Sequence, residues 1–353
     1  MKVRFGNETQ FFSELRKRVD NYFHSNDLKH TGNYKLYSKG IILFVTLAAI
    51  YTTIVFLDPP IWISILLCCI AGVNLSAIGF NIMHDGAHGS FSSKRIVNDI
   101  MGFSLNIMGG NVDLWKQKHN INHHSFTNVE GMDDDIDIKP FIRVHSDQKR
   151  YWFHRFQHFY ALFLYGFTLV FWVFFQDFRK YFSGKIGTTK IKKMNTFTHL
   201  SFWGSKVMHI GLFIILPFFF VGVLPTLLGY GIMVFVAGIV LSVVFQLAHV
   251  VEGVDFVPKE KEIKLESEWA VHQINTTVNF STKSKTLNWL LGGLNFQVEH
   301  HLFPRISHVH YPQISKIVKS TCEEFNVAYK EFPTLFKALR SHMLHLRMVG
   351  RYA

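Results

Sequence analysis

The sequence predicts an all-α integral membrane protein with four transmembrane helices in two hairpins and a histidine-rich metal site at their cytoplasmic end. Three observations support this prediction. The 353 residues are 48% hydrophobic and only 18% charged, which is too apolar for an ordinary soluble domain. The apolar residues gather into runs long enough to cross a bilayer. Many of the 20 histidines form clusters near the ends of these runs.

The first hairpin is predicted at residues 40–83. The apolar run Gly40–Leu57 is broken at Asp58-Pro59-Pro60, and the run Ile61–Met83 follows directly. Each run approaches the roughly 20 residues that a helix needs to cross the hydrocarbon core. Because proline cannot continue a helix, the short break makes the two helices an antiparallel pair.

The second hairpin is predicted at residues 207–250. Its two apolar runs are Val207–Leu228 and Gly231–Val250, and Gly229-Tyr230 is expected to form the turn between them. A fifth apolar stretch, Tyr160–Gln176, lies between the two hairpins.

Eight histidines follow a pattern, whereas the other histidines are scattered. They occur in HDGAH (84–88), in HNINHH (119–124), at the end of the last apolar run, and in LNFQVEHHLFP (294–304). They are His84, His88, His119, His123, His124, His249, His300 and His301. All of them are predicted to lie on one side of the membrane, at its surface.

The spacing of these histidines suits metal binding. Residues four apart share one face of a helix, so His84 with His88, and His119 with His123, can each bind one ion. His124 points about 100° away from His123, which suits a second ion. Imidazole suits Zn, Cu, Fe and Ni. The three cysteines have no metal-site spacing, and no Glu-x-x-His pair occurs in the chain, so the site is rich in histidine and poor in carboxylate.

Basic residues predict the orientation. They gather in residues 1–39, in Arg179–Lys206 and in the tail after His301. Under the positive-inside rule these segments share the cytoplasmic side. Tyr160–Gln176 then cannot cross the membrane and is predicted to lie in the interface or to dip in and return. The alternative, a fifth span, would put the last histidine cluster on the opposite side from the first.

This reasoning divides a single membrane-bound domain, 1–353, into five parts. They are an N-terminal interfacial segment at 1–39, the first hairpin at 40–83, a cap with the first two histidine clusters at 84–206, the second hairpin at 207–250, and a cap with the third cluster at 251–353. The formal net charge is +12. Because the basic residues flank apolar runs and form no tract of their own, nucleic acid is not an expected partner.

The histidine clusters resemble the three histidine boxes of the integral-membrane fatty acid desaturases. The resemblance is carried by HDGAH, HNINHH and QVEHH and covers most of the chain. The glutamine that begins the third box, Gln297, and the segment Glu268–Phe280 resemble the front-end branch, the delta-5/delta-6, linoleoyl-CoA desaturase-like enzymes. That branch acts between an existing double bond and the carboxyl end of the acyl chain.

The resemblance implies a cap that holds two iron ions and uses O2 to remove two hydrogens from neighbouring methylenes of an acyl chain. The family's ligands carry over onto the eight patterned histidines. Gln297 stands where relatives outside this branch have a ninth histidine, and we interpret it as a weaker or water-bridged ligand. In some relatives an asparagine four residues before the position of His249 bonds an iron-bound water. Here that position is Phe245, with Gln246 beside it.

Further residues are assigned with less support. Asp85, Glu299, His272 and Gln246 are predicted to lie behind the ligands, where carboxylates and amides orient ligating imidazoles. Trp115, Lys116 and Lys118 could hold an anionic head group, although solvated lysines at the membrane surface are an equal interpretation. Asp113 and Asp135 could orient ligating histidines in the same way, although an exposed loop carboxylate is the competing interpretation for Asp135, and the acidic stretch 132–140 is expected to be a loop.

The expected partners are a fatty acyl substrate, carried on CoA or a lipid, and a separate electron donor with its reductase. The donor is expected to be a ferredoxin or a free cytochrome b5, because the sequence contains no HPGG haem motif and only 39 residues precede the first predicted span. A bacterial inner membrane is the favoured location, with the endoplasmic reticulum second.

Three other functions compete with acyl desaturation. Lipid hydroxylation or ketolation, and desaturation of a sphingoid base, would use the same scaffold. A histidine-rich metal transporter is the remote alternative, because transporter ligands are expected near the bilayer midplane and not at its boundaries.

Overall fold

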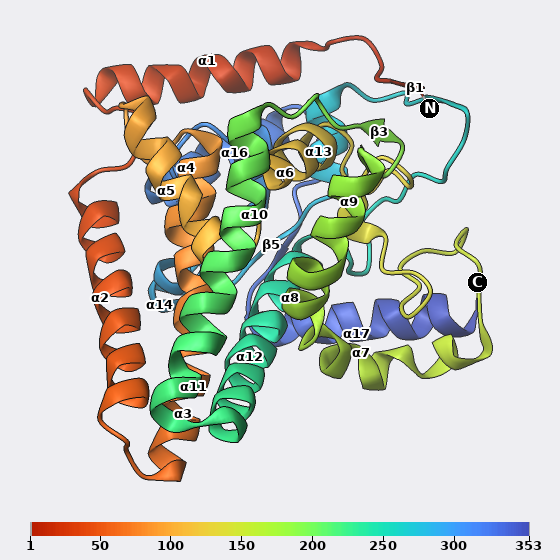
Figure 1. Cartoon of the computed structure of the whole chain (residues 1–353). Coiled ribbons are helices and arrows are strands. Elements are labelled where there is room, and N and C mark those ends of the chain that lie inside the picture. Colours follow the sequence, from red (N-terminus) through yellow and green to blue (C-terminus); the bar gives the residue numbers. More distant parts are fainter. Residues whose placement is uncertain (1, 353) are drawn as a thin grey trace.

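The computed structural model describes residues 2–352 and is mostly helical (Figure 1). Four helices are long and apolar enough to cross a membrane. They are Tyr34–Phe56, Ile61–His88, Thr196–Val221 and Val223–His249. The first consists of α2 (Tyr34–Phe56) and the last of α12 (Val223–His249). Their two short connections lie together at one end of the molecule, and most of the remaining chain lies at the other end (Figure 1).

The second of these helices extends beyond its predicted end. It consists of α3 (Ile61–Ile78), the π-helical segment η1 (Gly79–Met83) and α4 (His84–His88). Gly89 then ends the helix with a φ of 75°. The first histidine cluster was predicted to follow the span, but it lies on the last turn of the same continuous helix.

The third and fourth helices meet at a different point from the predicted one. The third consists of α10 (Thr196–Ile210), the π-helical segment η6 (Gly211–Ile215) and α11 (Leu216–Val221). Gly222, with a φ of 85°, makes the turn to α12, so the prediction of a turn at Gly229-Tyr230 is wrong. Gly229 instead lies within α12, where a Cβ would come within 3.2 Å of Cys68 Sγ. The absence of a side chain at Gly229 lets α12 pack closely against α3.

Small residues bring α3 and α12 together. A Cβ on Gly72 would lie 2.5 Å from the carbonyl oxygen of Met233, so only glycine fits this contact. One turn along, Ser76 Oγ donates a hydrogen bond of 3.3 Å to the carbonyl oxygen of Ala237. Small residues and serine hydroxyls are the usual means of close packing between helices in a membrane.

A bent pair of helices lies beside α12. Its two arms, Trp152–Tyr165 and Thr168–Ser183, meet at 74°. A Cβ on Gly166 would lie 2.1 Å from the ring of Phe235, and Ser242 Oγ donates to Thr168 Oγ1 at 2.9 Å. The pair consists of η4 (Trp152–Phe156), α7 (Gln157–Tyr165), α8 (Thr168–Phe171), η5 (Trp172–Gln176) and α9 (Asp177–Ser183). The bend lies within the stretch predicted not to cross the membrane.

The remaining helices cover the end that carries the histidines. They are α1 (Gln10–Ser25), α5 (Arg95–Ile107), α6 (Val112–Lys116), η2 (Gln117–His123), η3 (Asp134–Ile136), α13 (Trp269–Asn275), α14 (Lys285–Leu290), α15 (Gln297–Leu302), η7 (His308–His310), α16 (Tyr311–Glu324) and α17 (Leu335–Arg351). Helix α1 lies across the top of this region (Figure 1). Its apolar residues Phe11, Leu15, Val19 and Phe23 are buried in a cluster that includes residues of α16. The apolar face of α1 thus packs against the protein, and the interfacial location of residues 1–39 stays a prediction.

Two of the three pairs of short strands link segments that are distant in the sequence. In parallel, β1 (Lys2–Arg4) pairs with β4 (Glu262–Lys264) and β5 (Asn279–Phe280) with β6 (Glu331–Phe332). In the antiparallel pair, β2 (Lys185–Ile186) joins β3 (Thr189–Lys190).

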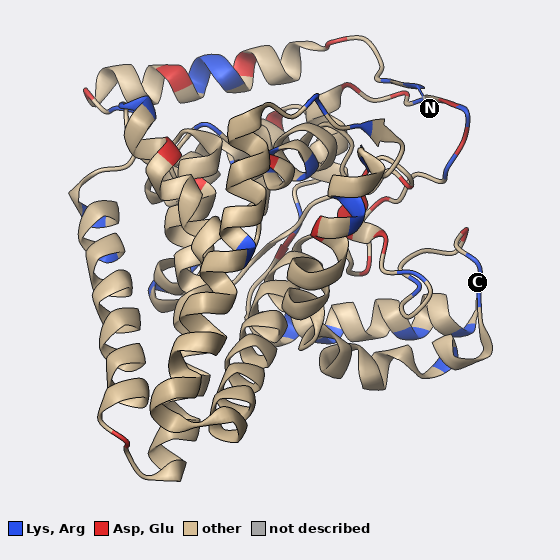
Figure 2. Cartoon of the chain, viewed as in Figure 1, with Lys and Arg blue, Asp and Glu red and all other residues tan. Residues whose placement is uncertain are grey.

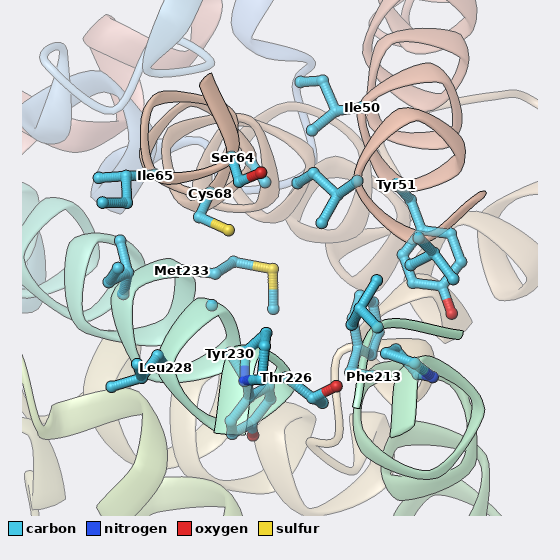
Figure 3. A pocket seen from close by; sticks show the side chains of 18 of the residues that line it. Ile50, Tyr51, Ser64, Ile65, Cys68, Phe213, Thr226, Leu228, Tyr230 and Met233 are labelled. Carbon is cyan, nitrogen blue, oxygen red and sulfur yellow. The ribbon is translucent and has the colours of Figure 1, made fainter. Parts of the chain in front are cut away.

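Charged residues are distributed unevenly along the long helices. The lower half of the four candidate spans has almost none, apart from the connection between α2 and α3 (Figure 2). The same lower half contains a cavity of about 490 Å³. Side chains such as Ile50, Cys68 and Met233 line it, from α2, α3, α11 and α12 (Figure 3). We refer to it as the lower cavity; none of the patterned histidines lines it.

Candidate metal centre

The patterned histidines converge from four parts of the chain into two adjoining groups. In each group, one ligand atom per residue lies within 4.8 Å of all the others. Group A consists of His84, His88, His119 and His300. Group B consists of His123, His249 and His301. His124 lies between the groups, with its ring centroid 4.5 Å from both His300 and His301.

Helix geometry explains this arrangement. His84 and His88 are four apart on α4 and fall into the same group, as their spacing predicts. His119 and His123 are also four apart, but they lie on the π-helical segment η2 and fall into different groups. The two rings nevertheless stay close, with centroids 5.1 Å apart, and His119, His123 and Asp135 form a third set whose ligand atoms lie within 4.8 Å of one another.

The nitrogen atoms of these histidines fit a metal site. Buried Nε2 atoms of His84, His88, His123 and His300 have no hydrogen-bond partner in the described chain. The Nε2 atoms of His119 and His124 face each other at 3.2 Å, as do those of His249 and His301. Buried polar atoms without partners are costly, and a bound metal ion would satisfy them.

Burial also keeps the imidazoles neutral. It lowers the pKa of His119, His124, His300 and His301 well below the usual range, and the neighbouring histidines lower it further. Burial lowers the pKa of His123 as well, but the Asp133 and Asp135 carboxylates together more than offset this, and the net shift is upward. Because metal ions bind neutral imidazole, the protein presents most of these ligands in the required form.

Several histidines are oriented through their other ring nitrogen. His123 Nδ1 lies 3.0 Å from Asp133 Oδ2, and His301 Nδ1 lies 2.8 Å from Gln273 Oε1. His249 Nδ1 lies 3.1 Å from the carbonyl oxygen of Thr276, and His300 Nδ1 lies 3.2 Å from the Tyr311 hydroxyl. Such contacts fix the tautomer and direct Nε2 toward a shared point. The sequence analysis missed all four partners.

Three of the four residues predicted to lie behind the ligands have other partners. Ser307 Oγ donates to Asp85 at 2.7 Å, and His308 Nδ1 lies 3.1 Å from the same carboxylate. Asn279 and Tyr329 donate to Glu299, and burial raises the pKa of Glu299 to about 7. His272 bonds the carbonyl oxygen of Thr127. None of these contacts reaches one of the eight histidines directly.

The two glutamines keep unpaired amide atoms. Gln297 is 1% exposed, and its Nε2 has no hydrogen-bond partner in residues 2–352. It lies three and four residues before His300 and His301 on α15, on the same helix face. Gln246 is also buried, and its Oε1 is likewise without a partner. Each amide has the capacity to bond a further ligand or a water molecule.

A second cavity, of about 360 Å³, adjoins group A. We refer to it as the side cavity. His119, Trp115, Phe245 and Gln246 line it, with residues 134–142, the bent helix pair and the upper part of α12. The Trp115 ring stacks on His119 with centroids 4.3 Å apart, so Trp115, one of the predicted head-group residues, lies against the metal centre.

The structure separates the two lysines predicted to hold a head group. Lys116 pairs with Asp99 at 3.6 Å and lines a surface depression that also contains Asp113. Lys118 is mostly buried, forms an ion pair with Asp135 and lines the side cavity.

The fold and site together combine four helices that could span a membrane with buried histidine groups that could hold metal ions, beside a largely apolar cavity. A profile of the fatty acid desaturase family matches residues 60–333. The acyl-lipid (8-3)-desaturase of Physcomitrium patens is 38% identical over 96% of this chain and 72% of its own length. The sn-1 linoleoyl-lipid 6-desaturases of Arthrospira platensis and of Synechocystis sp. are each 34% identical over 99% of this chain, and over 95% and 98% of their own lengths. The chain belongs to the fatty acid desaturase family and is an oxidoreductase.

Proposed function

We propose that this chain is an oxygen-dependent, front-end acyl-lipid desaturase that holds two iron ions in groups A and B. The observation that carries the proposal is the convergence of seven histidines into two groups, in which four Nε2 atoms are buried and have no hydrogen-bond partner within residues 2–352. Group A would hold one ion and group B the other. His124 lies between them and could bind either ion.

The donor set favours iron over zinc. A structural zinc site has four ligands and usually includes cysteine, and none of the three cysteines belongs to either group. Two adjoining imidazole sites suit a pair of redox-active ions. When bound, the iron pair would supply the oxidant that a methylene without an acidic proton requires.

The protein itself contributes a defined position for the acyl chain and an apolar surrounding. The side cavity would hold an acyl chain beside His119 of group A, whose ring contacts the Trp115 and Phe245 rings that also line the cavity. The cavity is mostly apolar along the bent helix pair, where Phe167 and Phe171 line it. The lower cavity is larger, but it contains no metal ligand, and we assign it no part in the reaction.

We infer the topology from charge and shape. The two connections at Asp58-Pro59-Pro60 and Gly222 lie at the end with few charges, and the basic residues lie at the histidine end (Figure 2). This distribution supports two membrane hairpins beneath a cytoplasmic cap. The aromatic residues Trp152, Phe159 and Phe163 are exposed on the bent pair, as expected for a segment at the membrane interface.

The helix bounds in the structure change the proposed division of the chain. The hairpins become 34–88 and 196–249, and residues 2–33, 89–195 and 250–352 form the cap. A bacterial inner membrane remains the proposed location, with the endoplasmic reticulum second. The donor remains a ferredoxin or a cytochrome b5, recruited by the basic cap through electrostatic attraction.

A fatty acid profile tests the proposal. The chain is expressed in a host that makes only saturated and monounsaturated acids, linoleic acid is supplied, and double-bond positions are determined by mass spectrometry. We expect a new double bond on the carboxyl side of the existing ones, absent in a His300→Ala variant. A hydroxylated product would overturn the desaturase assignment, and a purified protein that contains only zinc would overturn the iron assignment.

A further inference from the structure

The side cavity has one charged end and one apolar end. Lys118, Asp134, Asp135, Asp137 and Lys139 line the charged end. The bent helix pair and α12 line the rest, chiefly with aromatic and aliphatic side chains. An acyl chain has the same division, because its only polar group is the carbonyl at its head. The cavity therefore favours one direction of entry, with the carbonyl at the charged end.

Lys118 is the side chain at this end with unused hydrogen-bonding capacity. It is only 17% exposed and forms an ion pair with Asp135. An ammonium group has three N–H donors, and within residues 2–352 no further hydrogen-bond partner of Lys118 is recorded. Two donors are thus available in a largely buried cavity. Burying them without partners is costly, so a ligand that accepts a hydrogen bond there is favoured.

The position of Lys118 relative to the metal centre is fixed by three consecutive aspartates. Asp133 bonds His123 of group B at 3.0 Å, and Asp134 pairs with Lys180 at 2.8 Å. Asp135 pairs with Lys118, and it also offers an oxygen within 4.8 Å of ligand atoms on His119 and His123. One short segment therefore holds a metal-group histidine and the Lys118 ammonium at a set separation.

We propose that Lys118 donates a hydrogen bond to the carbonyl oxygen of the substrate's acyl group and so sets how many carbons separate that carbonyl from the new double bond. The inference rests on the proposed front-end desaturation and adds the residue that determines its position. The ligand chemistry is an acyl carbonyl, either an ester in a glycerolipid or a thioester on CoA.

Charge and geometry favour a neutral carbonyl over an anionic head group. The Lys118 charge is already balanced by Asp135, and Asp134 and Asp137 lie nearby. A phosphate placed there would add negative charge to an acidic surrounding. Apolar contacts along the rest of the cavity are nearly equivalent for every methylene, so they cannot set the register of a hydrocarbon chain. A charge-assisted hydrogen bond to the single polar group can.

The first test uses the unmodified protein and an altered substrate. The purified wild-type enzyme, supplied with an electron donor, is given glycerolipids that carry the same unsaturated chain through an ester or through an ether bond, which lacks the carbonyl. We expect one double-bond position with the ester. With the ether we expect a mixture of neighbouring positions and a kcat/KM at least about tenfold lower. Equal position and rate with both lipids would overturn the proposal.

Two variants locate the contact. In Lys118→Met, which has no N–H donor, and in the charge-balanced Lys118→Met/Asp135→Asn, ester and ether lipids should give the same mixture of positions. Lys180→Met is the matched control, since it breaks another buried ion pair of the same segment but does not line the side cavity. It should keep the wild-type position whatever its stability. A wild-type position in both Lys118 variants, with iron retained, would overturn the proposal.

The outcomes are separable from those of the proposed function. A wild-type enzyme that makes no front-end product from the ester refutes the function itself. Correct product with no effect of the ether bond refutes only the role of Lys118. Giving the same chain as a CoA thioester identifies the carrier, because both esters and thioesters offer the carbonyl and only the true substrate is turned over efficiently.

Discussion

Groups A and B are adjacent and similar in composition, but the protein supports them differently. Each histidine of group B has a recorded Nδ1 partner: Asp133 for His123, the Thr276 carbonyl for His249 and Gln273 for His301. Within residues 2–352, His300 alone in group A has such a partner, the Tyr311 hydroxyl. Group A, through His119, borders the side cavity, whereas no histidine of group B lines it.

This difference suggests that group B is held more rigidly than group A. Contacts to Nδ1 hold an imidazole in one tautomer and orientation, so group B is a rigid site whose geometry is set by the surrounding polar residues. Group A depends more on packing among its own rings and on Trp115, which stacks on His119. The site next to the substrate is the less constrained of the two. Substitutions in the two groups can test this comparison.

The largest expected effect is the loss of one ligand from either group. His88→Ala removes a ligand of group A only, and His249→Ala removes a ligand of group B only. Each should lower the iron content from about two ions per chain to about one and abolish detectable desaturation, since the reaction needs both ions. Iron is measured on purified protein, and product by fatty acid analysis. His158→Ala, outside both groups, is the control. A fully active variant of either group would refute its assignment as an iron site.

A smaller loss is expected when the support of group B is weakened. Asp133→Asn removes the carboxylate that bonds His123 Nδ1 and the backbone N–H of Asn128 at 2.9 Å. Removing such a supporting carboxylate costs about 10–100-fold in metal affinity or activity. Iron retention during titration with a chelator measures the effect, and Asp147→Asn is the control because its carboxylate is mostly exposed. Wild-type retention would show that group B does not depend on this support.

Asp133 also shows where sequence reasoning reached its limit. The stretch 132–140 was expected to be an acidic loop, yet Asp133 is 1% exposed and bonds a clustered histidine. Spacing along one helix predicted the pair His84 and His88, because both partners lie on one element. The contact from Asp133 depends on how a loop folds back over η2, which no local pattern specifies. The same holds for Gln273 and Tyr311, which come from α13 and α16.

The four apolar helices were predictable because about 20 apolar residues are required wherever a helix crosses a bilayer. Their ends were predicted less well. The sequence placed a turn at Gly229-Tyr230, but glycine serves two purposes in a membrane protein. At Gly222 it provides a positive φ, and at Gly229 it lets α12 approach Cys68 of α3. Only the packed structure distinguishes the two uses.

The third prediction concerns Gln297, which adjoins both groups on α15. Replacing it with histidine adds an imidazole where the amide has an unpaired Nε2. If Gln297 tunes the nearby iron as a weak or water-bridged ligand, Gln297→His should retain both ions and change turnover several-fold. Turnover and product position are measured together, with Gln297→Asn as the control that keeps the amide. Unchanged turnover and product would make the tuning role unnecessary and leave Gln297 as a structural residue.

The smallest effect is expected from the one recorded Nδ1 contact of group A. Tyr311→Phe removes the hydroxyl that lies 3.2 Å from His300 Nδ1 while keeping the buried ring. A single neutral hydrogen bond contributes about 1 kcal/mol, which corresponds to a loss of roughly fivefold in iron affinity. Chelator titration of this variant beside Asp133→Asn compares the two groups directly. If group A relies on packing among its rings, the Tyr311 variant should lose iron less readily than the Asp133 variant. The reverse order would show that group A is the more rigidly supported site and would contradict the proposed difference between the two groups.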